Sequence, residues 1–257
     1  MIDPTDRGFT LGDGLFETVL AEDGRLAHLD AHLDRMAAGC AVLGLPAPDR
    51  ARAETAMREA LARAGLTPAR AAARLTWSAG PGGRGLDRPE TLSPVLVATA
   101  APAAKPEGPA RLVTSALRRN DRSPAAGLKT LGYVDNVLAR REARAAGADE
   151  ALMLNTRGQL ACAAAANLFW VAGDRLITPA LDCGVLPGIV RGRVIAAARA
   201  RGIAVEEAAA GPEILASADA IFLTNSLIGL RAVSAVDDVR CPQSRMADIL
   251  SGDLEVV

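Results

Sequence analysis

Lysine is the residue type whose scarcity points to chemistry in this chain. Of 29 lysines and arginines in 257 residues, only Lys105 and Lys129 are lysines, and the other 27 are arginines. A compositional preference for arginine removes lysines that can be exchanged. It cannot remove a lysine whose amine reacts, because a guanidinium stays protonated and is not a nucleophile. The two remaining lysines are therefore candidates for amine chemistry, such as a covalent bond to a carbonyl carbon.

Lys129 has the context that such chemistry requires. It follows the small and apolar run Pro124 to Leu128 and stands just before a predicted helix. Partial burial among such neighbours would favour the neutral, nucleophilic amine. The alternative is a solvated surface lysine near a helix start, which is the commoner situation for this residue type. Lys105 lies in the proline-rich stretch 101–109, and we assign it no role.

Two further segments could bind an anion. Gly184 to Arg191 leads into a predicted helix, and a helix N-terminus presents backbone N–H groups to an anion. Leu223 to Ser226 follows an apolar strand and offers hydroxyl donors at a position where α/β sheets place ligands. Each pattern also fits an ordinary loop or turn.

The hydrophobic pattern predicts the elements that position these residues. Helices are expected at 28–45, 50–65, 132–147, 190–201 and 242–250. Strands are expected at 15–20, 74–78, 94–99, 111–117, 150–155, 159–164, 167–171, 175–178, 203–207, 219–224 and 231–236. This is an α/β chain of the α+β type with two domains. We expect a small N-terminal domain at 1–104, a proline-rich linker at 105–110 and a larger C-terminal domain at 111–257.

Composition argues against several classes of function. A formal net charge of −1 with scattered arginines does not favour a nucleic-acid binder, and no apolar run is long enough to span a membrane. The N-terminal residues have no apolar core of a signal peptide. Four cysteines without a C-x-x-C pair, and two histidines, do not favour a metal site. We expect a cytoplasmic protein with reduced cysteines, no bound metal, no membrane contact and no nucleic-acid partner.

Six motifs occur in one order along nearly the whole chain. They are Gly12 to Thr18, Ala31 to Met36, Gly127 to Tyr133, Ala166 to Trp170, Leu186 to Arg191 and Leu223 to Ser226. In this order they resemble the class IV family of pyridoxal-phosphate enzymes, which includes branched-chain aminotransferases, D-amino-acid transaminases and aminodeoxychorismate lyases. The resemblance implies a two-domain fold, pyridoxal 5′-phosphate (PLP) held between the domains, and a homodimer acting on a small-molecule substrate.

The resemblance also implies roles for particular residues. Lys129 would form the covalent bond to the cofactor aldehyde and act as the catalytic residue. The cofactor phosphate would be held by the set Arg35, the backbone N–H groups of Ile189 and Val190, and the Ser226 hydroxyl. Tyr133 would lie near the cofactor O3′ atom.

Two stretches resemble aminodeoxychorismate lyases more than other members. The Gly82 to Gly85 loop is similar to a G-G-R-G loop of those lyases, and Cys162 to Trp170 is similar to their C-A-A-N-L-F-W stretch. By this resemblance Arg84 and Asn225 would contact carboxylates of the substrate, although Arg84 alone also fits a solvated turn. The expected activity is release of pyruvate and 4-aminobenzoate. The alternatives are a D-amino-acid or branched-chain transaminase and a degenerate PLP-binding protein of low activity.

The chain departs from the family pattern at three places. The family has a glutamate five residues before the asparagine of its N-L-F motif, where it pairs with the pyridine nitrogen, and this chain has Cys162. A neutral thiol is a poor partner for a pyridinium, so we expect weaker stabilisation of charge by the cofactor ring, unless another group or a water supplies the contact. Gly132 stands where asparagine is common. The segment Asp6-Arg7-Gly8 begins almost at the start of the chain, without the usual preceding strand.

Overall fold

The computed structural model describes residues 2–243 and 245–254, and it divides into two compact units. Unit 1 comprises the chain up to Lys105 together with Leu128–Gly132, and unit 2 comprises Pro106–Gly127 and the chain from Tyr133 onward. The first boundary falls within the 105–110 segment. The short stretch around Lys129 belongs to unit 1, whereas the sequence placed all of 111–257 in the second domain.

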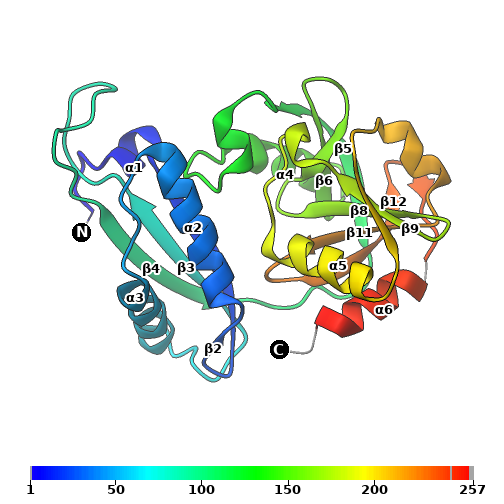
Figure 1. Ribbon diagram of the computed structural model, residues 1–257, viewed down its shortest axis with the longest axis horizontal. Coiled ribbons are helices and arrows are strands. Elements are labelled where there is room, and N and C mark those ends of the chain that lie inside the picture. The colour runs from blue at the N-terminus through cyan, green and yellow to red at the C-terminus, as the bar shows by residue number, and fades with distance from the viewer. Residues whose placement is uncertain (1, 244, 255–257) are drawn as a thin grey trace. The chain divides into compact units, whose positions relative to one another are not determined.

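Unit 1 is an antiparallel sheet covered by two helices (Figure 1). Its strand order is β2-β1-β3-β4, with bounds Arg25–Leu26, Gly14–Glu22, Ala71–Ser78 and Val95–Pro102. Helices α2 (Leu29–Leu43) and α3 (Arg50–Arg63) bury Leu33, Met36 and Met57 in one core with strand residues such as Leu15 and Leu75. Because side chains alternate along β1, Leu15 points toward the helices and Phe16 points to the opposite face of the sheet.

The segment around Lys129 is attached to the first strand of unit 1. The backbone N–H of Phe16 donates to the Lys129 carbonyl at 2.9 Å, and the Leu131 N–H donates to the Gly14 carbonyl at 3.0 Å. Leu15 and Thr130 form an isolated antiparallel bridge. The lysine is thus held by backbone pairing with β1, and the sequence did not predict this because the partners are more than a hundred residues apart.

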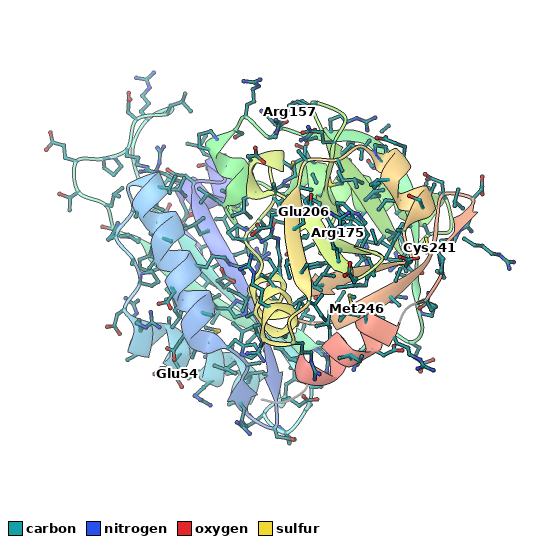
Figure 2. The ribbon with its side chains drawn as sticks, turned by 45° about the vertical axis from the view of Figure 1, so that its right-hand side comes forward. Glu54, Arg157, Arg175, Glu206, Cys241 and Met246 are labelled. Atoms are coloured by element: carbon teal, nitrogen blue, oxygen red, sulfur yellow. The ribbon has the colours of Figure 1, made fainter. Side chains whose placement is uncertain are left out.

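Unit 2 contains a mixed sheet of nine strands among the described residues. The order β10-β9-β8-β11-β12-β5-β6-β7, with β13 beside β12, combines parallel and antiparallel pairs. Strand bounds in chain order are β5 Ala110–Arg119, β6 Glu150–Asn155, β7 Leu160–Ala163, β8 Asn167–Ala172, β9 Arg175–Pro179, β10 Ala204–Ala208, β11 Ala220–Asn225, β12 Gly229–Val236 and β13 Val239–Arg240. Arg175 of β9 and Glu206 of β10 form an ion pair of 2.9 Å across the first parallel pair (Figure 2).

Three apolar clusters organise unit 2. Residues from both ends of the strand order, including Leu160 and Ile177, share one core, so the sheet curves around it. Helices α5 (Ile189–Ala200) and α6 (Arg245–Leu254) cover β8 and β11 on the other side, where Phe169 and Phe222 stack with ring centroids 5.1 Å apart. Helix α4 (Val134–Ala145) packs small residues against β6 and β7.

Most predicted elements occur within a few residues of their expected bounds, and the differences lie at short or polar segments. Helix α1 (Arg7–Leu11) was not predicted, and Asp6 caps it by accepting from the Gly8 and Phe9 N–H groups. Helix α6 begins at Arg245, later than the predicted 242, and residue 244 lies outside the described residues. In the described part of the chain, no helix is long and apolar enough to span a bilayer.

Candidate active site

A buried carboxylate fixes Arg35, the first of the predicted phosphate ligands. Glu17 of β1 is 1% exposed and accepts from Arg35 Nε at 2.8 Å and from Arg35 Nη2 at 2.6 Å. His32, also 1% exposed, lies on the same helix as Arg35, and its Nδ1 is 2.7 Å from Glu17 Oε2. One carboxylate thus orients an imidazole and a guanidinium presented by consecutive turns of α2.

The electrostatics of this triad favour an ionised Glu17. Burial acts to raise the pKa of Glu17, but hydrogen bonds from His32 and Arg35 outweigh it and hold the pKa below its ordinary value. An ionised acceptor requires that His32 Nδ1 carries the hydrogen. The planar Arg35 fork is bidentate on Glu17, which fixes the plane of the guanidinium as well as its position.

The Lys129 amine lies over the aromatic ring of Phe16, the residue next to Glu17 in β1. Its Nζ is 4.1 Å from the centroid of the Phe16 ring, and Arg74 of β3 has its Cζ 3.7 Å from that centroid. The negative face of an aromatic ring attracts cations, so the ring suits the Arg74 guanidinium, and it also contacts the Lys129 amine. Phe16 is the neighbour of Glu17 in β1, so the lysine is associated with the face of the sheet opposite to the one that carries Glu17.

In unit 2, an asparagine shapes the N-terminus of α5. Asn167 at the start of β8 donates from Nδ2 to the Leu186 carbonyl at 2.9 Å. Gly188 is the N-cap of α5, and a Cβ at this position would lie 2.0 Å from Asn167 Oδ1. Glycine is therefore required for the loop to approach the amide, and no side chain caps the helix at this N-cap. The first N–H groups of α5, at Ile189 and Val190, are those that a helix leaves for an anion.

The end of β11 lies beside this N-terminus through strand pairing. Thr224 is in register with Asn167 and is fully buried, and its Oγ1 has no hydrogen-bond partner among the described residues. Asn225 accepts at Oδ1 from the Leu227 and Ile228 N–H groups, both at 2.9 Å. A buried hydroxyl without a partner, next to an uncapped helix N-terminus and Ser226, fits a phosphate group.

Asn225 has a structural role that the sequence did not predict. Besides closing the turn after β11, it donates from Nδ2 to the Ala165 carbonyl at 2.9 Å. This bond ties the turn to the loop between β7 and β8. The predicted contact of Asn225 with substrate stays a prediction.

Cys162 is buried among small apolar side chains. It is 7% exposed and belongs to a cluster with Ala139, Ala143 and Met153, between α4 and the β6–β7 pair. Burial raises the pKa of the Cys162 thiol, and the charge of Arg119 acts in the opposite direction. The Arg119 guanidinium itself donates to the carbonyls of Gly184 and Ala126. The thiol is neutral at ordinary pH and adds no negative charge.

The two remaining predicted residues are the N-cap of a helix and a residue of an exposed loop. Tyr133 is the N-cap residue of α4 and is half-buried. Arg84 is exposed in the loop between β3 and β4, where Gly82, Gly83 and Gly85 all have positive φ angles. Left-handed backbone of this kind favours glycine, so the loop needs its glycines whatever Arg84 does.

The structure thus groups the predicted residues within each unit. In unit 1, Arg35 and Lys129 are held by neighbouring residues of β1. In unit 2, strand pairing brings the α5 N-terminus to the turn at Ser226.

Four residues that shape these groups were not assigned roles from the sequence. They are Glu17, Arg74, Asn167 and Thr224. The sequence could have indicated Glu17, because it lies on the core-facing side of an apolar strand. A carboxylate buried there needs a charged or hydrogen-bonding partner. The other three depend on which strand lies next to which, and that information is not local.

Comparison with known proteins shows which family the chain resembles. The family model described as amino-transferase class IV matches residues 14–236. An aminodeoxychorismate lyase from Vibrio harveyi is 30% identical over 259 residues, covering 97% of this chain and 94% of that protein. A putative branched-chain-amino-acid aminotransferase from Methanocaldococcus jannaschii is 31% identical over 239 residues, covering 90% and 81%.

A solved structure extends the comparison to the fold. The crystal structure of 4-amino-4-deoxychorismate lyase from Pseudomonas aeruginosa superposes with a TM-score of 0.89 at 32% identity, covering 99% of this chain and 94% of that one. The match includes the strands that carry Glu17 and Asn167 and the helices that carry Arg35 and Val190. The chain therefore belongs to the class IV aminotransferase family of pyridoxal-phosphate-dependent enzymes.

Proposed function

We propose that this enzyme is a 4-amino-4-deoxychorismate lyase that releases pyruvate and 4-aminobenzoate, a precursor of folate. The observation that carries the proposal is the glycine-rich loop 82–85, which presents an exposed arginine suited to a carboxylate. The similarity to two lyases along nearly the whole chain supports it.

The resemblance assigns the cofactor contacts residue by residue. In unit 1, Arg35 would bind the phosphate and Lys129 would bind the aldehyde carbon. In unit 2, the Ile189 and Val190 N–H groups and the Ser226 hydroxyl would bind the phosphate. The uncapped N-terminus of α5 and the unpartnered Thr224 hydroxyl fit this assignment. Bound PLP supplies an electron-withdrawing ring that stabilises negative charge on the substrate carbon bearing the amino group.

Lys129 would carry the proton transfers. Its free amine would remove the proton from the substrate carbon that bears the amino group. The bond between the ring and the enolpyruvyl oxygen then breaks, the ring becomes aromatic, and enolpyruvate leaves. Lys129 returns the proton to the methylene carbon of the enolpyruvate, which gives pyruvate. Arg84 and Asn225 would hold the substrate carboxylates during these steps.

The neutral Cys162 favours elimination over transamination in this scheme. Transamination moves a proton between two carbon atoms and needs a long-lived negative charge, which a protonated pyridine nitrogen stabilises. A buried thiol does not hold a proton on that nitrogen. In an elimination the negative charge departs with the leaving group. The reaction therefore depends less on stabilisation of that charge by the ring.

The test is incubation of the PLP-loaded enzyme with aminodeoxychorismate. The proposal expects 4-aminobenzoate and pyruvate in equal amounts. Failure to form 4-aminobenzoate, with normal cofactor absorbance, would overturn it. Rapid loss of the cofactor absorbance with D- or branched-chain amino acids would favour a transaminase, an alternative that the similarity to the putative Methanocaldococcus jannaschii aminotransferase supports. No cofactor uptake would indicate a degenerate protein.

We further propose that the enzyme works as a cytoplasmic homodimer on this small-molecule substrate. Sedimentation of the holoenzyme at a mass twice the 26.5 kDa of the chain would agree with a dimer. A monomer at working concentration would contradict it.

A further inference from the structure

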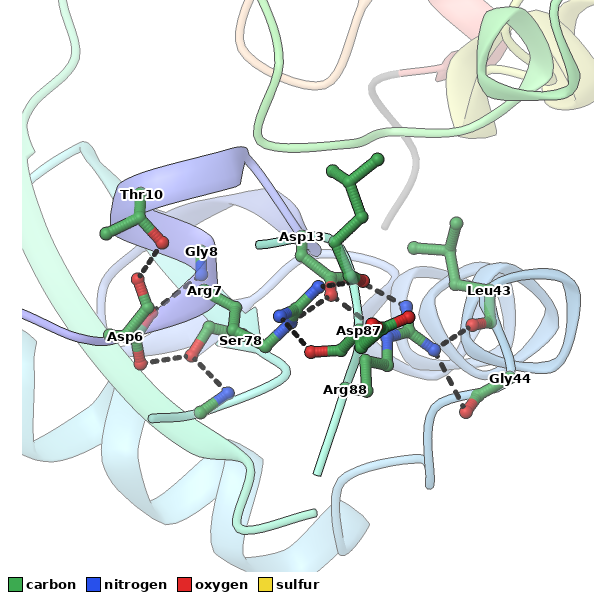
Figure 3. A network of polar contacts seen from close by, with 12 residues as sticks. Asp6, Arg7, Gly8, Thr10, Asp13, Leu43, Gly44, Ser78, Asp87 and Arg88 are labelled. Carbon is green, nitrogen blue, oxygen red and sulfur yellow. Dashed lines mark hydrogen bonds and ion pairs between the residues drawn. The ribbon is translucent and has the colours of Figure 1, made fainter. Parts of the chain in front are cut away.

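One guanidinium holds three consecutive backbone carbonyls of the loop Pro81 to Arg88, hereafter the 81–88 loop. Arg7, whose side chain is 5% exposed, donates from Nη2 to the Leu86 carbonyl and from Nη1 to the Asp87 carbonyl, both at 2.9 Å (Figure 3). A longer contact of 3.5 Å joins Nη1 to the Gly85 carbonyl. Such a planar fork fixes the orientation of successive peptide groups, which a lysine ammonium could not do.

A single carboxylate then ties the C-terminal end of this loop to the rest of unit 1. Asp13 accepts from Arg7 Nε at 2.9 Å, and it accepts from Arg88 in a bidentate pair of 2.9 and 2.6 Å (Figure 3). Arg88 also donates to the Leu43 carbonyl at the end of α2, at 2.6 Å. The hydrogen bond from Arg88 leads the causes that hold the pKa of Asp13 below its ordinary value, so the carboxylate stays ionised.

Close packing inside the 81–88 loop adds to this restraint. Gly83 has φ +80°, and a Cβ there would lie 2.2 Å from the Asp87 carbonyl oxygen and 3.0 Å from Arg7 Nη1. The loop therefore folds back tightly over the guanidinium. At its tip, Arg84 is exposed and Leu86 is 84% exposed. The exposed Arg84 and Leu86 side chains thus extend from loop backbone that the Arg7 guanidinium holds in place.

We propose that Arg7, Asp13 and Arg88 are positioning residues that preset the 81–88 loop, so that Arg84 meets a carboxylate-bearing ring substrate without first ordering the loop. The inference rests on the proposed function for the identity of the substrate. Preordering matters because binding through a flexible arginine would lose free energy in fixing side chain and loop together. The Arg7–Asp13–Arg88 network acts through Arg84 and does not itself touch the reacting atoms.

Limited tryptic digestion of the holoenzyme tests the positioning without any substrate. Asp13→Asn should be cut after Arg84 about tenfold faster than the wild type, because the loop opens more often. The matched control is Asp30→Asn, which breaks the exposed ion pair with Arg50 and should leave the rate unchanged. Equal cleavage rates for Asp13→Asn and wild type would overturn the inference.

Steady-state kinetics with aminodeoxychorismate tests the link to recognition. Arg84→Gln should raise KM roughly tenfold with kcat little changed, as loss of a charged hydrogen-bond donor does. Asp13→Asn should raise KM similarly, and the double variant should be no worse than Arg84→Gln alone, since the network acts through Arg84. Additive effects would overturn the coupling. If wild type does not turn over this substrate, the proposed function fails while the digestion still decides the positioning.

Discussion

Replacement of Glu17 by glutamine removes the charge that organises Arg35 while keeping the shape of the side chain. Glu17 accepts three hydrogen bonds, two from Arg35 and one from His32, and the partner side chains are 13% and 1% exposed. Because Glu17 and His32 are buried and the Arg35 side chain is only 13% exposed, solvent screens little of the loss. Glutamine keeps one acceptor oxygen. Its NH₂ group is itself a donor, so it cannot accept the hydrogen bonds that the second carboxylate oxygen receives from Arg35 or His32.

The magnitude follows from the burial. Removing one partner of a buried ion pair costs about 3–5 kcal/mol, because the other charge stays desolvated. For a chain of this length, that lowers Tm by about 6–20 °C. Thermal unfolding of the holoenzyme followed by circular dichroism measures it, with Asp30→Asn as a control for an exposed pair. A Glu17→Gln variant that unfolds within about 2 °C of the wild type would refute the assignment of Glu17 as the anchor of Arg35.

The pH dependence provides a second check on the same variant. The folded-state pKa of Glu17 lies below its unfolded value, which is about 4.3. Its stabilisation is therefore fully present above that unfolded value and is lost as the pH falls through the folded-state pKa. The difference in Tm between wild type and Glu17→Gln should be constant near neutrality and shrink in acid. A difference that grows in acid contradicts the sign of this argument.

Three other changes test the site. Lys129→Arg should abolish turnover, although the composition tolerates arginine elsewhere, because a guanidinium cannot bond to the cofactor aldehyde; product formation by this variant would contradict the role of the amine. Gly188→Ala should weaken PLP binding at least tenfold, because the new Cβ would lie 2.0 Å from Asn167 Oδ1. Equilibrium titration with PLP measures it, and Gly192→Ala, which meets nothing within 4 Å, should bind normally. Cys162→Glu should speed the loss of cofactor absorbance with amino acids, and no gain would count against our account of that position.

Local patterns in the sequence predicted most of the fold. The stripe at 29, 33, 36, 40 and 43 predicted α2 because an amphipathic helix shows its period within a few turns. Alternating or continuous apolar runs likewise predicted β1, β6, β8 and β11. Helix α1 was missed because five residues are too few to show a period, and its cap at Asp6 depends on hydrogen bonds rather than on apolar spacing.

The contacts around the candidate site were less accessible to sequence reasoning. Motif resemblance placed Lys129 and Arg35 in the same site, but neither composition nor spacing indicated that both depend on β1. The network that joins Arg7 to Arg88 spans more than seventy residues of sequence, so no window along the chain contains it. Cys162 is a contrasting case, since the absence of a carboxylate at that position was visible in the sequence alone.

The pairing of Leu128–Gly132 with β1 also constrains how the chain is made. Synthesis proceeds from the N-terminus, and early domains usually fold while later residues are still being added. In this chain, residues up to Lys105 are synthesised before the segment around Lys129. Until that segment follows, residues 14–16 of β1 lack the backbone partners Lys129 and Leu131. Until residue 132 leaves the ribosome, part of that edge is open to pairing with other nascent chains. Lys129 thus reaches its place in the first unit on the segment that completes that unit, so the amine proposed to bind the cofactor is positioned only once residue 132 has been added.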